Sequence, residues 1–325
     1  MTAPEVPHVR WVDNPVLRRP TMIAAFTGWN DAGDAASNGV RQMIEAWNAK
    51  PLAEIDPEEF TDFATVRPHV RLTPERTRLI VWPTVGLWSA STPGGDVILV
   101  LGPEPALRWR MFCEQLLSVA ERFEVPFLVT LGALLADVPH SRPVRVIGTA
   151  SDDEVVNRFD LQHSRYEGPT GIVGVLHDAC ASADILSASL WAAVPAYAAQ
   201  IPSPAASMAL LQRVAAMVGS PPPTAALIAE AEAYGQRVDA LLDEDPDLRT
   251  YVDRLEIMHD EGALDDDLDD SDDLDVDDDD GDDEFGGAGD ASASGSRSDG
   301  SDRAVDAVND DLVAEVEQFL REQGG

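Results

Sequence analysis

The stretch 23-IAAFTGWNDAGDAASNGVRQMIEAW-47 decides the fold of this chain. It starts with an apolar run, breaks at Gly28, and continues with apolar residues at helical spacing. This order predicts a buried strand, a tight turn and a helix. The turn then has three interpretations: a phosphate-binding loop, a catalytic site, or a capped corner of a scaffold.

The turn lacks the features of a phosphate-binding loop. Gly28 and Gly33 are five residues apart, and no G-x-G-x-x-G sequence is present. Asp31 and Asp34 would repel a phosphate, whereas they complement the positive end of the helix dipole. We therefore predict that Asn30 or Asp31 caps the helix that follows. A ligand contact at these two residues remains the alternative.

Other apolar runs extend the same pattern along the chain. Strands that alternate with helices predict a mainly parallel sheet between helical layers, which is an α/β fold of the three-layer α/β/α sandwich type. The region 53–78 contains three prolines and favours short elements or an extra strand. Buried strands are predicted at 21–28, 78–83, 96–102, 125–133, 144–148 and 171–176, and helices at 35–48, 106–123 and 178–193.

After residue 202 the predicted elements are helices only. We expect an α/β core domain over 1–202 and a helical extension over 203–259 that packs on the core. The segment from Ile185 to Gln212 has no charged residue, but its prolines interrupt any continuous membrane span. We read it as a buried helix, a loop and a second helix. The extension contains helical patterns at 203–219, 224–244 and 246–259.

The C-terminal part has two further segments. Residues 260–303 combine aspartate runs with Gly, Ala and Ser, which predicts a disordered acidic linker. Residues 304–322 have apolar side chains at helical spacing and predict an amphipathic helix. This helix packs on its own subunit or contacts a partner, and both alternatives stay open. Its candidate contact residues are Leu312, Val316, Phe319 and Leu320.

Charge narrows the classes of function. The net charge is −36, and 17 Asp or Glu residues lie between Asp260 and Glu284. Because the rest of the chain is also acidic, nucleic acid is a poor candidate partner. Lys50 is the only lysine, which disfavours Schiff-base and P-loop chemistry. The N-terminal residues show no basic region followed by an apolar core, so we expect a cytoplasmic protein.

Candidate catalytic groups are few. The six histidines lack metal-ligand spacing, and we expect neither a metal nor a cofactor. Cys113 and Cys180 lie in helical patterns without a C-x-x-C sequence, which is typical of buried thiols. Asp137, His140 and Ser141 follow a predicted strand, where ligand crevices of α/β folds form. They give a weak signal for a hydrolytic site.

A second candidate surface is the segment 102-GPEPALRWRMF-112. Arg108 and Arg110 flank Trp109 after Glu104, so one face could present guanidinium and indole groups to an acidic or planar ligand. The alternative, which we prefer, is an Arg–Glu surface pair with Trp109 packed beneath it.

Four segments together resemble the proteasome assembly chaperone 2 (PAC2) family in its actinobacterial form. The likeness spans about residues 20–258 and keeps the order expected of an α/β domain followed by helices. The segments that carry it are 26-FTGWNDAGDAASNGV-40, 101-LGPEPALRWR-110, 130-TLGALLADVPH-140 and 194-VPAYAAQIPSPAASMALLQRVAAMVG-219.

The resemblance implies a fold and a role. The fold is an α/β/α sandwich similar to phosphorylase and hydrolase-like folds, and the assembly is oligomeric, often trimeric. Characterised relatives are non-enzymatic chaperones of 20S proteasome assembly. The positions that match recurrent family positions carry no catalytic role: Gly28, Asn30, Asp31, Glu104 and the Pro195–Tyr197 corner. Relatives that dock on the proteasome end in a hydrophobic residue, a tyrosine and any residue, but this sequence ends Gln323-Gly324-Gly325.

Two functional hypotheses follow. The first is an oligomeric scaffold or assembly chaperone, with 20S proteasome subunits as candidate partners, the acidic segment as a tether and the 304–322 helix as a ligand. The second is a small-molecule-binding hydrolase, such as a nucleosidase or amidohydrolase, with a crevice near Asn30 and His140. An enzyme needs a closed pocket with convergent titratable groups, whereas a scaffold needs a broad apolar patch.

Overall fold

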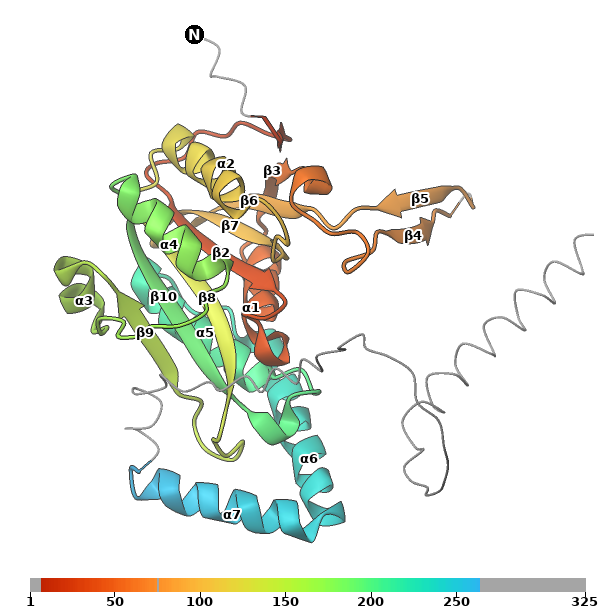
Figure 1. The fold of residues 1–325 in the computed structure, drawn as a ribbon, viewed down its shortest axis with the longest axis vertical. Helices are drawn as coiled ribbons and strands as arrows, with labels where there is room; N and C mark the ends of the chain where they lie inside the picture. The colour runs from red at the N-terminus through yellow and green to blue at the C-terminus, as the bar shows by residue number, and fades with distance from the viewer. Residues whose placement is uncertain (1–6, 75, 264–325) are drawn as a thin grey trace, which may run out of the picture. The chain divides into compact units, whose positions relative to one another are not determined.

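The computed structural model describes residues 7–74 and 76–263. In this part of the chain, an eight-stranded sheet has the order β1-β3-β6-β7-β2-β8-β10-β9 (Figure 1). The strands β7, β2, β8 and β10 are mutually parallel, and the remaining pairs are antiparallel. The bounds are β1 Val9–Trp11, β2 Thr21–Thr27, β3 Lys50–Ile55, β6 Val85–Thr92, β7 Gly95–Pro103, β8 Phe127–Ala136, β9 Val146–Ala150 and β10 Leu186–Pro195.

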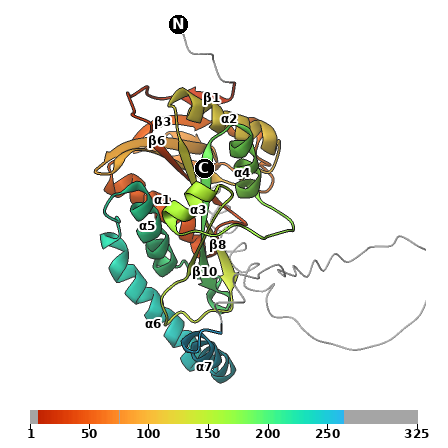
Figure 2. The same cartoon turned by 90° about the vertical axis from the view of Figure 1, so that its left-hand side faces the viewer.

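Helices cover both faces of the sheet. Figures 1 and 2 show α2 and α4 on one face and α1 and α5 on the other. Beyond this layer, α6 packs against α5, and α7 packs against α6. The bounds are α1 Ala35–Ala46, α2 Trp109–Arg122, α3 Asp153–Phe159, α4 Ile172–Ser182, α5 Pro204–Val218, α6 Ile228–Glu244 and α7 Pro246–Asp260, with short 3-10 helices η1 Ala32–Asp34, η2 Pro57–Glu59, η3 Ala196–Ala198 and η4 Ala225–Leu227.

The strand β2 shows why the sheet needs helices on both sides. Met22, Ala24 and Phe26 pack in the cluster that contains α2 and α4. Ile23 and Ala25 alternate with them and pack in the cluster that contains α1 and α5. A strand buried on both faces requires a continuous apolar run, as the sequence has here. The predicted α/β/α sandwich is confirmed, with a helical extension at its C-terminal side.

The expectation of a mainly parallel sheet is wrong for the strands on either side of the four central ones. The strands β6 and β7 form a hairpin whose last registered pair is Thr92 with Gly95, and so short a connection permits only antiparallel pairing. The strand β3 joins β6 antiparallel, and β1 joins β3 in the same sense. The parallel arrangement is thus confined to the centre of the sheet.

Two neighbouring elements were assigned to the wrong class. Residues 171–176, predicted as a strand, open the helix α4, whose buried residues Ile172, Leu176 and Cys180 recur every four positions. Residues 186–195, predicted as the end of a helix, form the buried strand β10 between β8 and β9. The charge-free segment is therefore a strand followed by α5. No helix of the described residues is long and apolar enough to cross a membrane.

The segment 78–83 is a strand, but it does not belong to the core. The strands β4 His69–Leu72 and β5 Arg78–Val81 form a separate two-stranded sheet that projects from the body (Figure 1). We call residues 67–82, without residue 75, the arm. An edge contact between the rings of Phe63 and Trp82, with centroids 5.2 Å apart, supports its base. The extra strand expected within 53–78 corresponds to β4.

Candidate functional site

The corner between β2 and α1 is closed by Asp31. Its Oδ1 accepts hydrogen bonds from the backbone N–H groups of Ala36 at 2.8 Å and Ser37 at 3.0 Å. Gly28 has φ 122°, a conformation that favours glycine, and its carbonyl accepts from the N–H of Asp31. Asp31 bonds the start of α1 as predicted, although the N-cap position of that helix is Asp34, whose side chain makes no cap bond. Asp31 therefore satisfies two of the N–H groups that a helix start leaves free.

Asn30 has a different role from the predicted cap. Its side-chain Nδ2 donates to Oε1 of Glu104 at 2.9 Å, and its carbonyl accepts from the N–H of Ala133 on β8. Glu104 directly follows β7, and its N–H donates to the carbonyl of Thr27. The ends of three parallel strands, β2, β7 and β8, are thus joined at one polar cluster.

Glu104 also closes the start of α4. Its Oε1 accepts from the N–H of Ile172, the first residue of that helix, at 2.8 Å. Gly171 fits against this group closely, because a Cβ at that position would lie 2.6 Å from Oδ1 of Asn30 and 2.9 Å from Oε1 of Glu104. We call Asn30, Asp31, Glu104 and Gly171 the carboxylate edge. Two helix starts, which elsewhere serve as anion sites, are here occupied by carboxylates of the chain itself.

Burial sets the electrostatics of this edge. Asn30 is 1% exposed and Asp31 is 6% exposed. Burial raises the pKa of Asp31, because water no longer stabilises the charged carboxylate, and the hydrogen bonds from Ser37 and Ala36 lower it in part. A second negative group, such as a phosphate, would have to displace Glu104 or Asp31 from its hydrogen bonds.

The arginines of the 102–112 segment do not converge on Glu104. Arg108 instead forms an ion pair with Glu59 at 2.7 Å, so the expected Arg–Glu surface pair exists with another partner. Trp109 is partly buried against the core, and its Nε1 donates to the carbonyl of Pro105. Arg110 is exposed. The sequence could not show that Glu104 is held by groups far away in the chain.

Asp137, His140 and Ser141 do not form a catalytic triad. Each bonds to a different partner in the C-terminal part of the fold, and no bond joins two of the three among the described residues. Asp137 accepts from the Tyr251 hydroxyl at 2.6 Å, His140 meets the Tyr197 hydroxyl at 2.9 Å and Asp239 at 3.1 Å, and Ser141 donates to Glu256. These polar residues fasten the loop after β8 to α6 and α7.

An ion pair that sequence reasoning missed completes this attachment. The guanidinium of Arg142 donates through Nε and Nη2 to the two oxygens of Asp260, both at 2.8 Å. This bidentate contact lowers the pKa of Asp260 to about 2. The sequence could not predict this ion pair, because the two residues are 118 positions apart.

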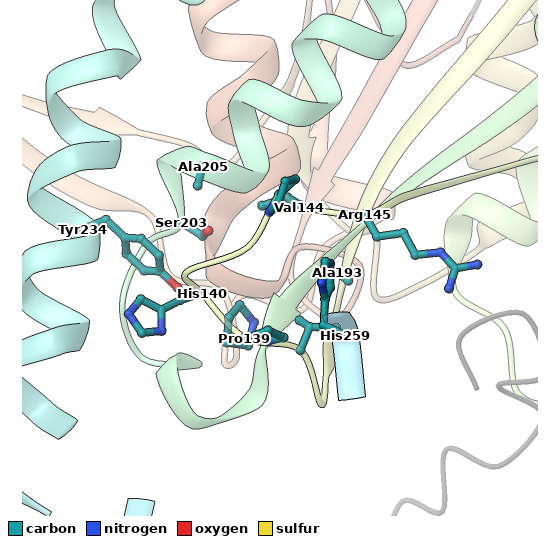
Figure 3. Close-up of a pocket in the computed structure, with 12 residues that line it drawn as sticks. Pro139, His140, Val144, Arg145, Ala193, Ser203, Ala205, Tyr234 and His259 are labelled. Atoms are coloured by element: carbon teal, nitrogen blue, oxygen red, sulfur yellow. The ribbon is translucent and has the colours of Figure 1, made fainter. Parts of the chain in front are cut away.

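The cavity beside this loop is small. Its volume is about 30 Å³, which is room for about two water molecules. Figure 3 shows His140, Ser203 and Tyr234 around it. Asn30 does not line it, so this cavity does not unite the two residues of the expected crevice. The full lining is Val138, Pro139, His140, Pro143, Val144, Arg145, Ala193, Pro195, Ser203, Ala205, Tyr234 and His259.

A wider, open depression of about 590 Å³ lies along α6 and the start of α5. Its charged lining residues are Glu230 and Arg237. Among the described residues, no group of three or more His, Cys, Asp or Glu side chains is placed to hold a metal ion. The predicted linker at 260–303, beyond residue 263, and the predicted helix at 304–322 lie outside the described residues. No geometry is therefore assigned to Leu312, Val316, Phe319 or Leu320.

Comparisons with known proteins place the fold in a family. A sequence model of the PAC2 family matches residues 25–242. A PAC2 family protein of Streptomyces avermitilis is 44% identical, with 72% of this chain and 99% of that chain covered and a TM-score of 0.67. A Mycobacterium tuberculosis protein described as a proteasome-assembly chaperone homologue is also 44% identical, with 71% and 99% covered and a TM-score of 0.65.

More distant structures share the fold alone. The archaeal proteasome activator PbaB of Pyrococcus furiosus is 15% identical, with 72% of this chain and 97% of that chain covered and a TM-score of 0.60. No curated protein matches the sequence. The family match covers more than half of the chain. The chain belongs to the PAC2 family.

Proposed function

We propose that this protein is a non-enzymatic assembly chaperone that works as an oligomeric scaffold, with subunits of a proteasome-type particle as its partners. The observation that carries the proposal is the occupied carboxylate edge. α/β enzymes bind their ligands at the carboxyl ends of the parallel strands. Here Glu104 and Asp31 fill that position with bonds to the chain's own backbone.

The relatives support the choice of partner. The Mycobacterium tuberculosis protein described as a proteasome-assembly chaperone homologue is 44% identical over 71% of this chain. A chaperone of this kind needs exposed surface that recognises incomplete assemblies, and apolar surface beyond the ordinary scatter indicates such contacts. The exposed apolar residues of the arm meet this need. The contact residues proposed from the sequence, Arg108 and Arg110, are also exposed.

The hydrolase hypothesis has weaker support. A nucleoside or similar substrate fills a pocket of several hundred cubic ångströms, and typical ligand sites span about 300–1,000 Å³. The enclosed cavity near His140 has about 30 Å³. The wider depression along α6 is open to solvent and brings together only one pair of opposite charges, Glu230 and Arg237.

A reconstitution experiment tests the proposal. Purified 20S α and β subunits are mixed with and without the full chain, and native mass spectrometry follows the assembly intermediates. We expect an intermediate that contains this chain, and faster formation of the complete particle. Native mass spectrometry of the chain alone reports the oligomer number, where a homo-oligomer, with a trimer as the first candidate, is expected. Turnover of a metabolite by a chain that binds no subunit would contradict the proposal.

The amphipathic segment 304–322 is proposed as a second partner contact through Leu312, Val316, Phe319 and Leu320. A chain without residues 304–325 should capture subunits less well than the full chain, whereas a full chain in which the residues of the exposed ion pair between Arg249 and Asp243 are exchanged should capture them equally. Undiminished capture after the deletion would assign partner binding to the body of the protein.

A further inference from the structure

One oxygen of Glu104 is not used by the carboxylate edge. Its Oε1 accepts hydrogen bonds from Asn30 Nδ2 and from the N–H of Ile172. Within the described residues, no hydrogen bond or ion pair reaches Oε2, and the side chain is partly exposed. Arg108, the nearest arginine along the sequence, pairs with Glu59 instead. Glu104 therefore keeps an acceptor oxygen that the described part of the chain does not satisfy.

The same cluster contains a second unused acceptor. Asn30 is 1% exposed, and its Oδ1 is buried with no hydrogen-bond partner among the described residues. This atom and Glu104 approach the same point, because a Cβ added to Gly171 would lie 2.6 Å from Oδ1 of Asn30 and 2.9 Å from Oε1 of Glu104. A buried acceptor without a donor costs free energy. A ligand that matches the two unused oxygens must therefore donate hydrogen bonds.

Large apolar side chains border the cluster. Trp29 is 57% exposed and stands between Gly28 and Asn30, both of which adjoin Glu104. Leu107, three residues after Glu104, is 49% exposed. Gly28 has no side chain to cover the carboxylate, and a Cβ added there would lie 3.8 Å from Oε2. An exposed indole and an exposed aliphatic side chain beside a charged acceptor are typical of a protein-binding hot spot.

We propose that Glu104, Trp29 and Leu107 form a docking site for an arginine side chain of a protein partner. A guanidinium has five N–H donors and no acceptor, which matches the unused oxygens. Its planar group also stacks on an indole, whereas the ammonium of lysine is a compact point charge. An acidic side chain would be repelled by Glu104. A metal ion fits less well, because no group of three or more His, Cys, Asp or Glu among the described residues is placed to hold one.

The site deepens the proposed function and rests on it, because the partner is taken to be a protein. It uses residues of the body and none of the arm. The arm presents apolar side chains, which select a partner by shape and hydrophobic area. The site at Glu104 adds a requirement of charge, since it accepts a basic group. The net charge of −36 attracts basic partners over a longer range.

A peptide titration tests the site on the full chain without any proteasome subunit. The probe is acetyl-Leu-Arg-Leu-amide. Its matched control contains citrulline, in which a neutral urea group replaces the guanidinium. Two-dimensional NMR follows the indole N–H signal of Trp29, which is identified by its absence in W29F. We expect the arginine peptide to bind at least about ten-fold more tightly than the citrulline peptide.

Three variants locate the contact. E104Q keeps the size of the side chain and removes its charge, so the arginine preference should fall below about two-fold. E45Q removes the same charge from an exposed position on α1 and should keep the full preference. L107S should weaken binding of the arginine peptide by about three-fold, because it removes apolar contact area. Unchanged indole signals of the other tryptophans exclude unfolding as the cause.

The possible outcomes separate this site from the proposed function. An equal response of Trp29 to both peptides, no response to either, an arginine preference that survives in E104Q, or undiminished binding by L107S would overturn the proposal. Arginine binding by a chain that fails to assemble proteasome subunits would keep the site and refute the chaperone function. Assembly by a chain that does not distinguish the two peptides would do the reverse.

Discussion

The carboxylate edge and the arm satisfy their side chains in opposite ways. At the edge, Glu104 and Asp31 each accept two hydrogen bonds from groups of the same chain, while Oδ1 of Asn30 and Oδ2 of Asp31 are buried without a partner among the described residues. In the arm, two strands pair only with each other within the described residues, and their aliphatic side chains face solvent. The edge is bonded into the body, whereas the arm exposes the surface proposed above for contacts with a partner. Four predictions test this contrast.

The largest effect is expected at Glu104. The substitution E104A leaves Asn30 Nδ2 and the N–H of Ile172 without their acceptor, and we expect the free energy of unfolding to fall by about 3 kcal/mol. E104Q keeps an oxygen in place and serves as the matched control, with a loss of about 1 kcal/mol. Urea denaturation measures both. Equal losses for the two variants would show that the charge, and not the shared acceptor, holds the edge.

A buried histidine behind the edge gives a pH-dependent effect. His177 lies on α4 with Nε2 2.8 Å from the Thr130 hydroxyl and Nδ1 2.8 Å from the Ser187 hydroxyl. Burial lowers its pKa from 6.5 to about 4. The unfolded chain therefore takes up a proton below pH 6.5 while the folded chain does not, and stability declines as the pH falls toward 4.

Between pH 7.5 and pH 5.0 this difference amounts to about 2 kcal/mol of unfolding free energy. Other groups also titrate in this range, so the quantity to compare is the pH slope of the wild-type chain against that of H177N. The variant should have a shallower slope, whatever its stability at pH 7.5. Parallel slopes would mean that His177 has the same pKa in the folded and the unfolded chain.

A smaller effect is expected at Asp31. D31A removes the acceptor of the Ala36 and Ser37 N–H groups and should cost about 1.5 kcal/mol. D31N retains an oxygen for both N–H groups and removes a buried charge, so it should cost less than D31A. Thermal unfolding followed by circular dichroism distinguishes the two. A more stable D31A would contradict the capping role.

The smallest effect on stability is expected in the arm. L72S/I80S should change the free energy of unfolding by no more than about 0.5 kcal/mol, because both side chains are exposed. L87S in the buried strand β6 is the matched control, and it should cost more than about 3 kcal/mol. If the arm variant lost as much as the core variant, the arm would be a part of the folding core.

The arm also explains why the sequence gives an incomplete account of the fold. The run 78-RLIVWP-83 has the apolar character of a core strand, and it was predicted as one. The local pattern indicates a strand, but it does not report whether that strand joins the main sheet or a separate two-stranded sheet. The element type was correct for this reason, and its place in the fold was wrong.

Composition misled the prediction at two other elements. The strand β10 is rich in Ala and Ser, which have weak strand preference, and its burial between β8 and β9 outweighs that preference. The helix α4 begins with Ile and Val and was taken for a strand. By contrast, β2 and α1 have both the apolar pattern and a capping residue in their favour, and they were predicted correctly.

The sequence predicted the role of Asp31 in the candidate site, but not the contacts of Glu104. Asp31 acts within its own turn, so spacing identified it as a cap. Asn30 and Ile172 reach Glu104 from 74 and 68 positions away, and no local pattern contains such pairings. Asn30 and Glu104 were candidates in the sequence analysis, Ile172 was not, and the contact that unites the three required the three-dimensional structure.

The glutamate that seals the start of α4 has a consequence for protein engineering. Its carboxylate occupies a helix start, a position that can bind an anion in other proteins. Re-opening this position means exchanging Glu104 for a short neutral side chain and restoring the lost stability elsewhere. A neutral residue at position 104 would leave the start of α4 open to an external anion, whereas Asp31 would still close the start of α1.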